Sequence, residues 1–272
     1  MSLVSTEWLD NNHSEVKIID SSWHMPNTNR NAYEEYKKEH IKNAIFFDID
    51  KFSNKKTELP HMLPNEEEWE KIVSNLGITN EDRIIVYDNS DVISSCRCWY
   101  TFIFFGHNPN LISVLNGGLL KWKKENRETT NKVSNHEKKN YKAIKISHLV
   151  KSKEEIDKNI LEKKFQVVDA RSKNRFLGLE KEPRLGVRSG SIQNSYCLPF
   201  GELINPEDKT FIEKNLIKKK FTNIGINNEK NIVFSCGSGI TAAVLGLAYS
   251  IINDKYLPVI YDGSWAEYGK IK

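Results

Sequence analysis

The feature that most constrains the fold of this chain is an internal repeat with a nearly constant offset. Four landmarks of the first half, each close to the end of a strand-like segment, recur in the second half in the same order. The offsets are 149 positions from Asp20 to Asp169, 148 from Asp88 to Cys236, 146 from Asn116 to Asp262 and 151 from Ala44 to Ser195. A near-constant spacing across unrelated landmarks indicates two copies of one domain.

Each copy alternates strand-like with helix-like segments. The strand-like segments are rich in Val and Ile, and long apolar runs at 96–105 and 239–250 are predicted to be helices. Strands that alternate with helices are typical of buried parallel sheets. The predicted fold is therefore α/β, with two tandem domains, each a mostly parallel sheet flanked by helices.

Length and composition suggest where the copies meet. A chain of 272 residues suits one large or two medium domains. Residues 125–141 are rich in Lys, Asn, Thr and Glu, which is typical of an exposed linker, and Ser152 followed by Glu155 is a capping-box signature that opens a helix. We predict a first domain at 1–125, a linker at 126–145 and a second domain at 146–272.

Charge and hydropathy bear on partners and location. The net charge of +4 comes from 40 basic and 36 acidic residues that are largely interleaved, whereas nucleic-acid binders concentrate basic residues on one face. No apolar stretch approaches the ~18 residues of a membrane span, and the first ten residues lack a signal-peptide pattern. We expect no nucleic-acid or membrane partner and a cytoplasmic location.

Four cysteines are too few for a disulfide scaffold in a chain of this length. Cys96 and Cys98 are two positions apart in a predicted helix, so they point to different faces and make a poor metal pair. Cys197 lies in a short strand-like stretch. We interpret all three as small buried apolar residues.

Cys236 differs because it follows a strand and opens a helix, in a loop with two glycines, Gly237 and Gly239. Such a loop can curl so that its N–H groups point to one centre, and the helix N-terminus adds positive potential there. Both effects favour a thiolate, which predicts a nucleophile. The alternative is a structural cysteine beside a glycine-rich turn. The first copy has Asp88 at the matching position, and one active copy with one silent copy fits an enzyme better than a structural role.

The chain resembles the two-domain rhodanese-like sulfurtransferases, and within them the 3-mercaptopyruvate sulfurtransferases. The resemblance runs from about Trp8 to Gly269. Its motifs are Phe46-Phe47-Asp48-Ile49-Asp50, Leu59-Pro60-His61-Met62-Leu63-Pro64, Ser113-Val114-Leu115-Asn116-Gly117-Gly118, Ser235-Cys236-Gly237-Ser238-Gly239-Ile240-Thr241-Ala242 and Tyr261-Asp262-Gly263-Ser264-Trp265. Thiosulfate-using members are basic just after the cysteine, whereas Gly237 and Ser238 are uncharged, as in the mercaptopyruvate class.

The resemblance implies roles for individual residues. Cys236 would attack the donor sulfur and become a persulfide. Ser238 matches a serine that acts with a histidine and an aspartate in proton transfer, and their matches here are His61 and Asp48, both in the first copy. The site would then lie in the cleft between the domains.

The resemblance also implies a substrate-binding set, formed by Arg175, Arg184 and the loop residues Gly237, Gly239, Ile240 and Thr241. Guanidinium groups suit the carboxylate of an α-keto acid because they bind it with two hydrogen bonds. The alternative for both arginines is surface ion pairing with Glu180 and Glu182.

The implied activity is transfer of sulfur from 3-mercaptopyruvate through a Cys236 persulfide to an acceptor, with release of pyruvate. The acceptor is expected to be a thiol, such as thioredoxin or a small thiol, or cyanide, and no metal or other cofactor is expected. Two alternatives remain: a thiosulfate sulfurtransferase, and a non-catalytic module of the same fold that senses or binds sulfur. A cysteine-based phosphatase is disfavoured because it needs an arginine six positions after the nucleophile, where this chain has Ala242.

Overall fold

The computed structural model describes residues 2–226 and 231–271. They form two compact units, each described here by itself. Unit 1 contains the residues up to 54 together with 63–146 and 206–211. Unit 2 contains 55–62, 147–205 and the residues from 212 onward. Each unit therefore includes one short segment from the other half of the sequence.

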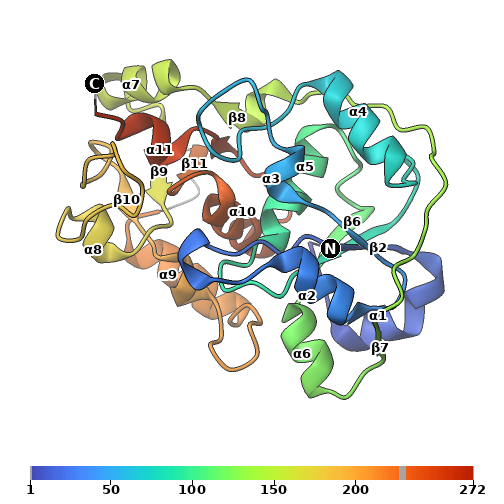
Figure 1. The fold of residues 1–272 in the computed structure, drawn as a ribbon. Helices are drawn as coiled ribbons and strands as arrows, with labels where there is room; N and C mark the ends of the chain where they lie inside the picture. The colour runs from blue at the N-terminus through green and yellow to red at the C-terminus, as the bar shows by residue number, and fades with distance from the viewer. Residues whose placement is uncertain (1, 227–230, 272) are drawn as a thin grey trace. The chain divides into compact units, whose positions relative to one another are not determined.

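Unit 1 is an α/β unit whose strands and helices alternate along the chain (Figure 1). Its strands are β1 (Leu3–Val4), β2 (Lys17–Asp20), β3 (His40–Ile41), β4 (Ala44–Phe46), β5 (Ile84–Tyr87), β6 (Ile112–Leu115) and β7 (Thr129–Thr130). Its helices are α1 (Thr6–Asn12), α2 (Ala32–Lys38), α3 (Ile49–Phe52), α4 (Glu66–Asn75), α5 (Ser95–Phe104) and α6 (Gly118–Lys124), with 3₁₀ turns η1 (His13–Glu15) and η2 (Pro26–Thr28).

Unit 2 has the same character. Its strands are β8 (Val150–Lys151), β9 (Phe165–Asp169), β10 (Tyr196–Cys197), β11 (Asn231–Ser235) and β12 (Ile260–Tyr261). Its helices are α7 (Lys153–Glu162), α8 (Lys173–Phe176), α9 (Lys214–Asn223), α10 (Ile240–Ile252) and α11 (Ser264–Tyr268), with 3₁₀ turns η3 (Ser147–Leu149) and η4 (Phe200–Leu203).

The strand order of the two main sheets confirms the repeat. Among the described residues the order is β1-β6-β5-β2-β4 in unit 1 and β8-β12-β11-β9-β10 in unit 2, and every neighbouring pair is parallel. The registers agree as well, since Asp20 pairs with Tyr87 and Asp169 with Ser235. The prediction of two tandem α/β domains with parallel sheets is confirmed.

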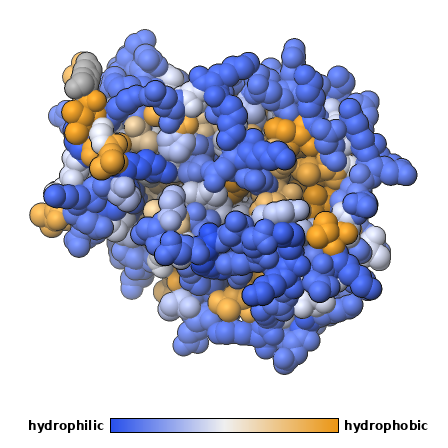
Figure 2. All heavy atoms as spheres, in the orientation of Figure 1, coloured by the Kyte–Doolittle hydropathy of each residue, from blue (hydrophilic) through white to orange (hydrophobic). Residues whose placement is uncertain are grey.

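Local sequence signals explain several of these elements. Helix α7 begins at the predicted capping box, in which Ser152 accepts the Glu155 N–H and the Glu155 side chain accepts the Ser152 N–H. Helix α5 is buried along its whole length, and α10 is buried over most of it, as their apolar sequences predict. The face drawn in Figure 2 is mostly hydrophilic, so apolar side chains are concentrated inside the units.

The segment predicted as a linker, 126–145, is exposed over most of its length, but the structure places it on unit 1. Strand β7 pairs with β3 in antiparallel fashion, and the buried Tyr141 donates its N–H to Ser74 Oγ. The polar composition of this segment gave no sign of these backbone contacts.

Among the described residues, no helix has both the length and the apolar character that crossing a membrane requires.

Candidate active site

The loop after β11 brings a backbone amide to the sulfur of Cys236. Gly239 adopts φ +82°, a left-handed conformation that favours glycine, and so turns the chain into α10. Its N–H donates to Cys236 Sγ at 3.1 Å. The cysteine is 1% exposed, and Ile240 and Thr241 form the first turn of α10 directly after the loop. The backbone can therefore stabilise negative charge on this sulfur.

Helix α11 supports the same loop from outside it. Cys236 N–H donates to Ser264 Oγ at 3.1 Å, and the N–H groups of Trp265 and Ala266 donate to the carbonyls of Cys236 and Gly237, each at 2.9 Å. Sequence reasoning assigned no role to these residues. The signal was the Tyr261-Asp262-Gly263-Ser264-Trp265 motif, which marks the resemblance without saying what it does.

Ser238 and His61 lie together in unit 2. His61 Nδ1 and Ser238 Oγ share a hydrogen bond of 2.9 Å, and both residues are buried. His61 belongs to the 55–62 segment that the structure groups with unit 2, although its sequence position lies in the first copy. The sequence motif thus pointed to a histidine that contacts the cysteine loop.

Asp48, the remaining predicted catalytic residue, lies in unit 1. It is the N-cap of α3, where its carboxylate accepts the Lys51 N–H at 2.9 Å. This contact is typical of aspartate before a short helix. A role for Asp48 in proton transfer stays a prediction.

The two predicted substrate arginines converge on the cysteine loop. A Cβ atom built on Gly237 would lie 3.3 Å from Arg175 Nη2 and 3.6 Å from Arg184 Nη1. Arg175 also forms the ion pair that the sequence left as an alternative, because its Nη2 donates to Glu182 Oε2 at 2.5 Å. One guanidinium thus both pairs with Glu182 and lies against the loop.

The other cysteines are in surroundings that favour the protonated thiol; Cys96 and Cys98 are buried as predicted, whereas Cys197 is only half-buried. Burial raises the pKa of the Cys96 and Cys98 thiols well above their ordinary value, and it raises the pKa of Cys197 to about 11. A protonated thiol is a weak nucleophile. The described residues also contain no group of three or more His, Cys, Asp or Glu side chains placed to hold a metal ion.

The first copy shows what replaces the cysteine. Leu119 N–H donates to the Asp88 carbonyl at 3.0 Å, as Trp265 N–H does to the Cys236 carbonyl, so the two positions are structurally equivalent. The Asp88 carboxylate accepts the N–H groups of Ser90 at 2.8 Å and Ser95 at 2.9 Å. The Asp88 carboxylate thus takes up two backbone amides of unit 1, and the absence of catalysis in this copy stays a prediction.

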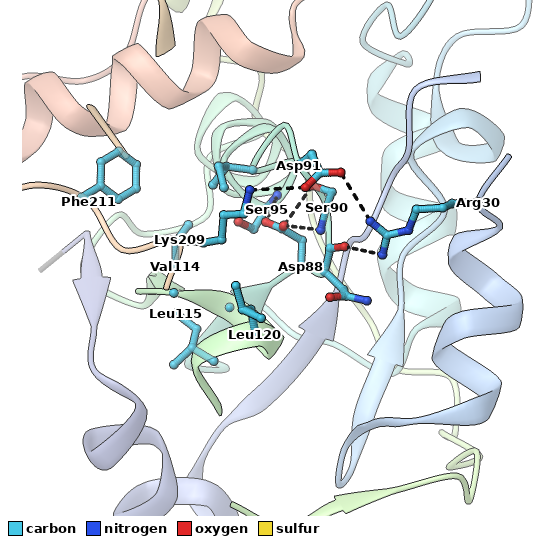
Figure 3. Close-up of a pocket in the computed structure, with 14 residues that line it drawn as sticks. Arg30, Asp88, Ser90, Asp91, Ser95, Val114, Leu115, Leu120, Lys209 and Phe211 are labelled. Atoms are coloured by element: carbon cyan, nitrogen blue, oxygen red, sulfur yellow. Dashed lines mark hydrogen bonds and ion pairs between the residues drawn. The ribbon is translucent and has the colours of Figure 1, made fainter. Parts of the chain in front are cut away.

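A cavity of about 210 Å³ lies beside Asp88 at the carboxyl ends of β5 and β6. Figure 3 shows Asp91 between Arg30 and Lys209, at 3.6 and 3.3 Å. Lys209 and Phe211 come from the 206–211 segment that the structure groups with unit 1. The cations that reach this cavity are thus paired by a carboxylate of the same unit.

Comparisons with known proteins agree with this architecture. The model of the rhodanese-like domain family matches residues 5–125 and 152–270, once for each copy. "Thiosulfate/3-mercaptopyruvate sulfurtransferase 1, mitochondrial" of Arabidopsis thaliana is 37% identical, over 98% of this chain and 75% of its own length. "3-mercaptopyruvate sulfurtransferase" of Mus musculus is 34% identical, over 98% and 91%.

A solved structure gives the same result in three dimensions. The crystal structure of SseA from Escherichia coli, described among 3-mercaptopyruvate sulfotransferases, superposes with a TM-score of 0.87 at 29% identity, and the match covers 97% of this chain and 99% of SseA. Two family matches, a repeated parallel sheet and a cysteine at the start of α10 in the second copy lead to one conclusion. The chain belongs to the two-domain rhodanese-like sulfurtransferases.

Proposed function

We propose that this protein transfers sulfur from 3-mercaptopyruvate, through a persulfide on Cys236, to a thiol or cyanide. The observation that carries the proposal is the convergence of three groups on one loop. The Gly239 amide donates to the cysteine sulfur, and Arg175 and Arg184 lie beside the neighbouring Gly237. This arrangement offers a nucleophile and a carboxylate-binding pair at neighbouring residues of one loop.

The proposed chemistry has two steps. The Cys236 thiolate attacks the donor sulfur, an S–S bond forms, and the C–S bond breaks with its electron pair passing to the enolate of pyruvate. A proton then reaches the enolate carbon to give pyruvate, and the Ser238–His61 hydrogen bond is our candidate for its delivery. In the second step an acceptor thiolate or cyanide attacks the outer sulfur, and the Cys236 thiolate leaves.

The donor assignment depends on charge as well as on the names of relatives. The Arabidopsis relative is named for both thiosulfate and 3-mercaptopyruvate, so that name does not choose between them. In this chain Gly237 and Ser238 add no charge to the loop, and the two arginines lie on one side of it. A donor with a carboxylate at one end and sulfur at the other fits this separation.

The acceptor and the location belong to the proposal as well. We expect a thiol acceptor, on a small molecule or on a protein such as thioredoxin, or cyanide. A cytoplasmic site of action remains our expectation, and fractionation of cells that express the protein would test it.

The covalent intermediate is tested by intact-mass measurement after donor treatment without acceptor. Wild type is expected to gain one sulfur atom, on the peptide that carries Cys236, and Cys236→Ser is expected to gain none and to lose all turnover. Single serine substitutions of Cys96, Cys98 and Cys197 serve as controls and should keep the added sulfur. Sulfur on another cysteine would refute the mechanism.

A further inference from the structure

Glu182 is a buried carboxylate that joins two arginines of unit 2. Its side chain is 3% exposed. Oε1 accepts from Arg171 Nη1 at 2.7 Å and from Arg175 Nε at 3.2 Å, and Oε2 accepts from Arg175 Nη2 at 2.5 Å. Two parallel hydrogen bonds fix both the distance and the plane of the Arg175 guanidinium.

Arg171, on the other side of Glu182, is firmly held. Its side chain is 1% exposed, and Nε and Nη2 donate to Asp169 Oδ2 at 2.9 and 2.6 Å. Nη2 also donates to the Gly190 carbonyl at 2.8 Å. Burial by itself would lower the pKa of Arg171, but the charges of Asp169 and Glu182 raise it. Arg171 is therefore a fixed cation.

Arg171 also connects this network to the cysteine loop. Its guanidinium lies over the ring of Trp265, 4.5 Å from the ring centroid. The backbone N–H of Trp265 donates a hydrogen bond to the Cys236 carbonyl. Contacts thus run from the loop through Trp265, Arg171 and Glu182 to Arg175. Arg175 itself sits on α8, a helix of four residues, and is more exposed, at 17%. Its long side chain has several rotamers to lose, so it needs such a partner to stay in place.

The same turn in unit 1 lacks this arginine. Ser22 N–H and Arg171 N–H each donate to the aspartate two positions earlier, Asp20 and Asp169, both at 2.9 Å. Ser22 is therefore the counterpart of Arg171, with the repeat offset of 149 positions. The copy that carries the cysteine thus has Arg171, which binds Glu182, whereas the other copy has Ser22 at the equivalent position.

We propose that Glu182 is a positioning residue for donor recognition, which holds Arg175 against the cysteine loop and offsets its charge. This rests on the proposed function. Asp169 pairs with Arg171 and Glu182 pairs with Arg175, so each of these two cations has a carboxylate partner.

Glu182→Gln tests the proposal, because it keeps the shape of the side chain and removes its charge. The KM for mercaptopyruvate is expected to rise roughly tenfold to a hundredfold, the usual effect of losing a charged hydrogen bond, while kcat changes by less than about threefold. Thiosulfate has no carboxylate to lose and gains from the added positive charge, so the ratio of specificity constants should shift toward thiosulfate. In an Arg175→Ala background the substitution should cause no further rise in KM.

Glu180→Gln is the matched control. Glu180 lies two positions away on the same loop, is exposed, and accepts a hydrogen bond from Ser172. Its substitution should leave both KM values unchanged. If Glu182→Gln does not fold, Glu182→Asp is the alternative, because it keeps the charge on a shorter side chain. Glu182→Asp should raise the KM for mercaptopyruvate in the wild-type background. In the Arg175→Ala background it should leave this KM unchanged.

Two results would overturn the inference while the sulfurtransferase assignment survives. One is an equal loss for both donors, expressed in kcat. The other is a loss that adds in full to that of Arg175→Ala, which is what a purely structural role predicts. A wild-type protein that forms no persulfide with either donor would instead refute the proposed function, and the inference with it.

Discussion

At one pair of equivalent positions, a carboxylate in one copy and a thiol in the other distinguish the two copies. Asp88 and Cys236 follow the same strand of each sheet, and each carbonyl accepts a backbone N–H from the first turn of a later helix, α6 or α11. The Asp88 carboxylate accepts hydrogen bonds from the backbone N–H groups of Ser90 and Ser95. The Cys236 sulfur receives the Gly239 amide and carries the chemistry that we propose.

The sequence was informative about these residues to different degrees. Cys236 could be identified from the glycines around it, because a loop between a strand and a helix has few ways to curl. Arg175 was recognisable only as one of a pair. That it would bind Glu182 and also face Gly237 depends on side-chain conformations, which spacing along the chain does not determine.

Ser238→Ala should reduce kcat for mercaptopyruvate by about a hundredfold, the lower end of what a positioned proton donor contributes, with little change in KM. The reason is the loss of the hydroxyl that shares a hydrogen bond with His61. Steady-state kinetics of the variant measure this, and Ser189→Ala, which removes a half-buried hydroxyl of the same unit, is the control. A normal kcat in Ser238→Ala would remove the serine from the mechanism.

At the scale of elements, the parallel sheets were predictable and the turns were not. Alternation of Val- and Ile-rich segments with apolar helices predicted the parallel sheets, and the capping box predicted the start of α7. The turns after β2 and β9 lie at equivalent positions of the repeat, yet the Asp169 side chain binds Arg171 whereas the Asp20 side chain binds Ser22. Their electrostatic consequences follow only from burial and contacts.

Asp20 should make the stability of unit 1 depend on pH. Burial raises the pKa of its carboxyl from 3.8 to about 6, although hydrogen bonds from Ser22 partly oppose the rise. The folded state thus holds this proton more tightly than the unfolded state. The contribution of this bound proton to the free energy of unfolding is fully present below pH 3.8 and is lost as the pH rises to about 6. The loss amounts to about 3 kcal/mol.

Asp20→Asn removes this titration and is the direct comparison. Chemical unfolding of wild type and variant between pH 4 and 7 should give free energies whose difference changes in favour of the variant as the pH rises. Two curves that stay parallel across this range would show that Asp20 does not titrate as described.

At the scale of the whole molecule, the repeat was predictable and the assignment of two short segments was not. Residues 55–62 belong with unit 2 and residues 206–211 with unit 1, which places His61 beside Ser238 and Lys209 beside Asp91. Constant offsets indicate which segments are equivalent. They do not indicate which segments are packed on the other unit, because that depends on tertiary contacts between residues far apart in sequence.

The identity of the donor is tested by the ratio of the specificity constants for mercaptopyruvate and thiosulfate, measured with one acceptor in wild type, Arg175→Ala and Arg184→Ala. Wild type is expected to prefer mercaptopyruvate. Each substitution should lower mercaptopyruvate use by ~1.5–3 kcal/mol, roughly tenfold to a hundredfold, and thiosulfate use by a smaller factor, because only mercaptopyruvate has a carboxylate to lose. A wild-type preference for thiosulfate, or a ratio that both substitutions leave unchanged, would show that mercaptopyruvate is not the donor these arginines recognise.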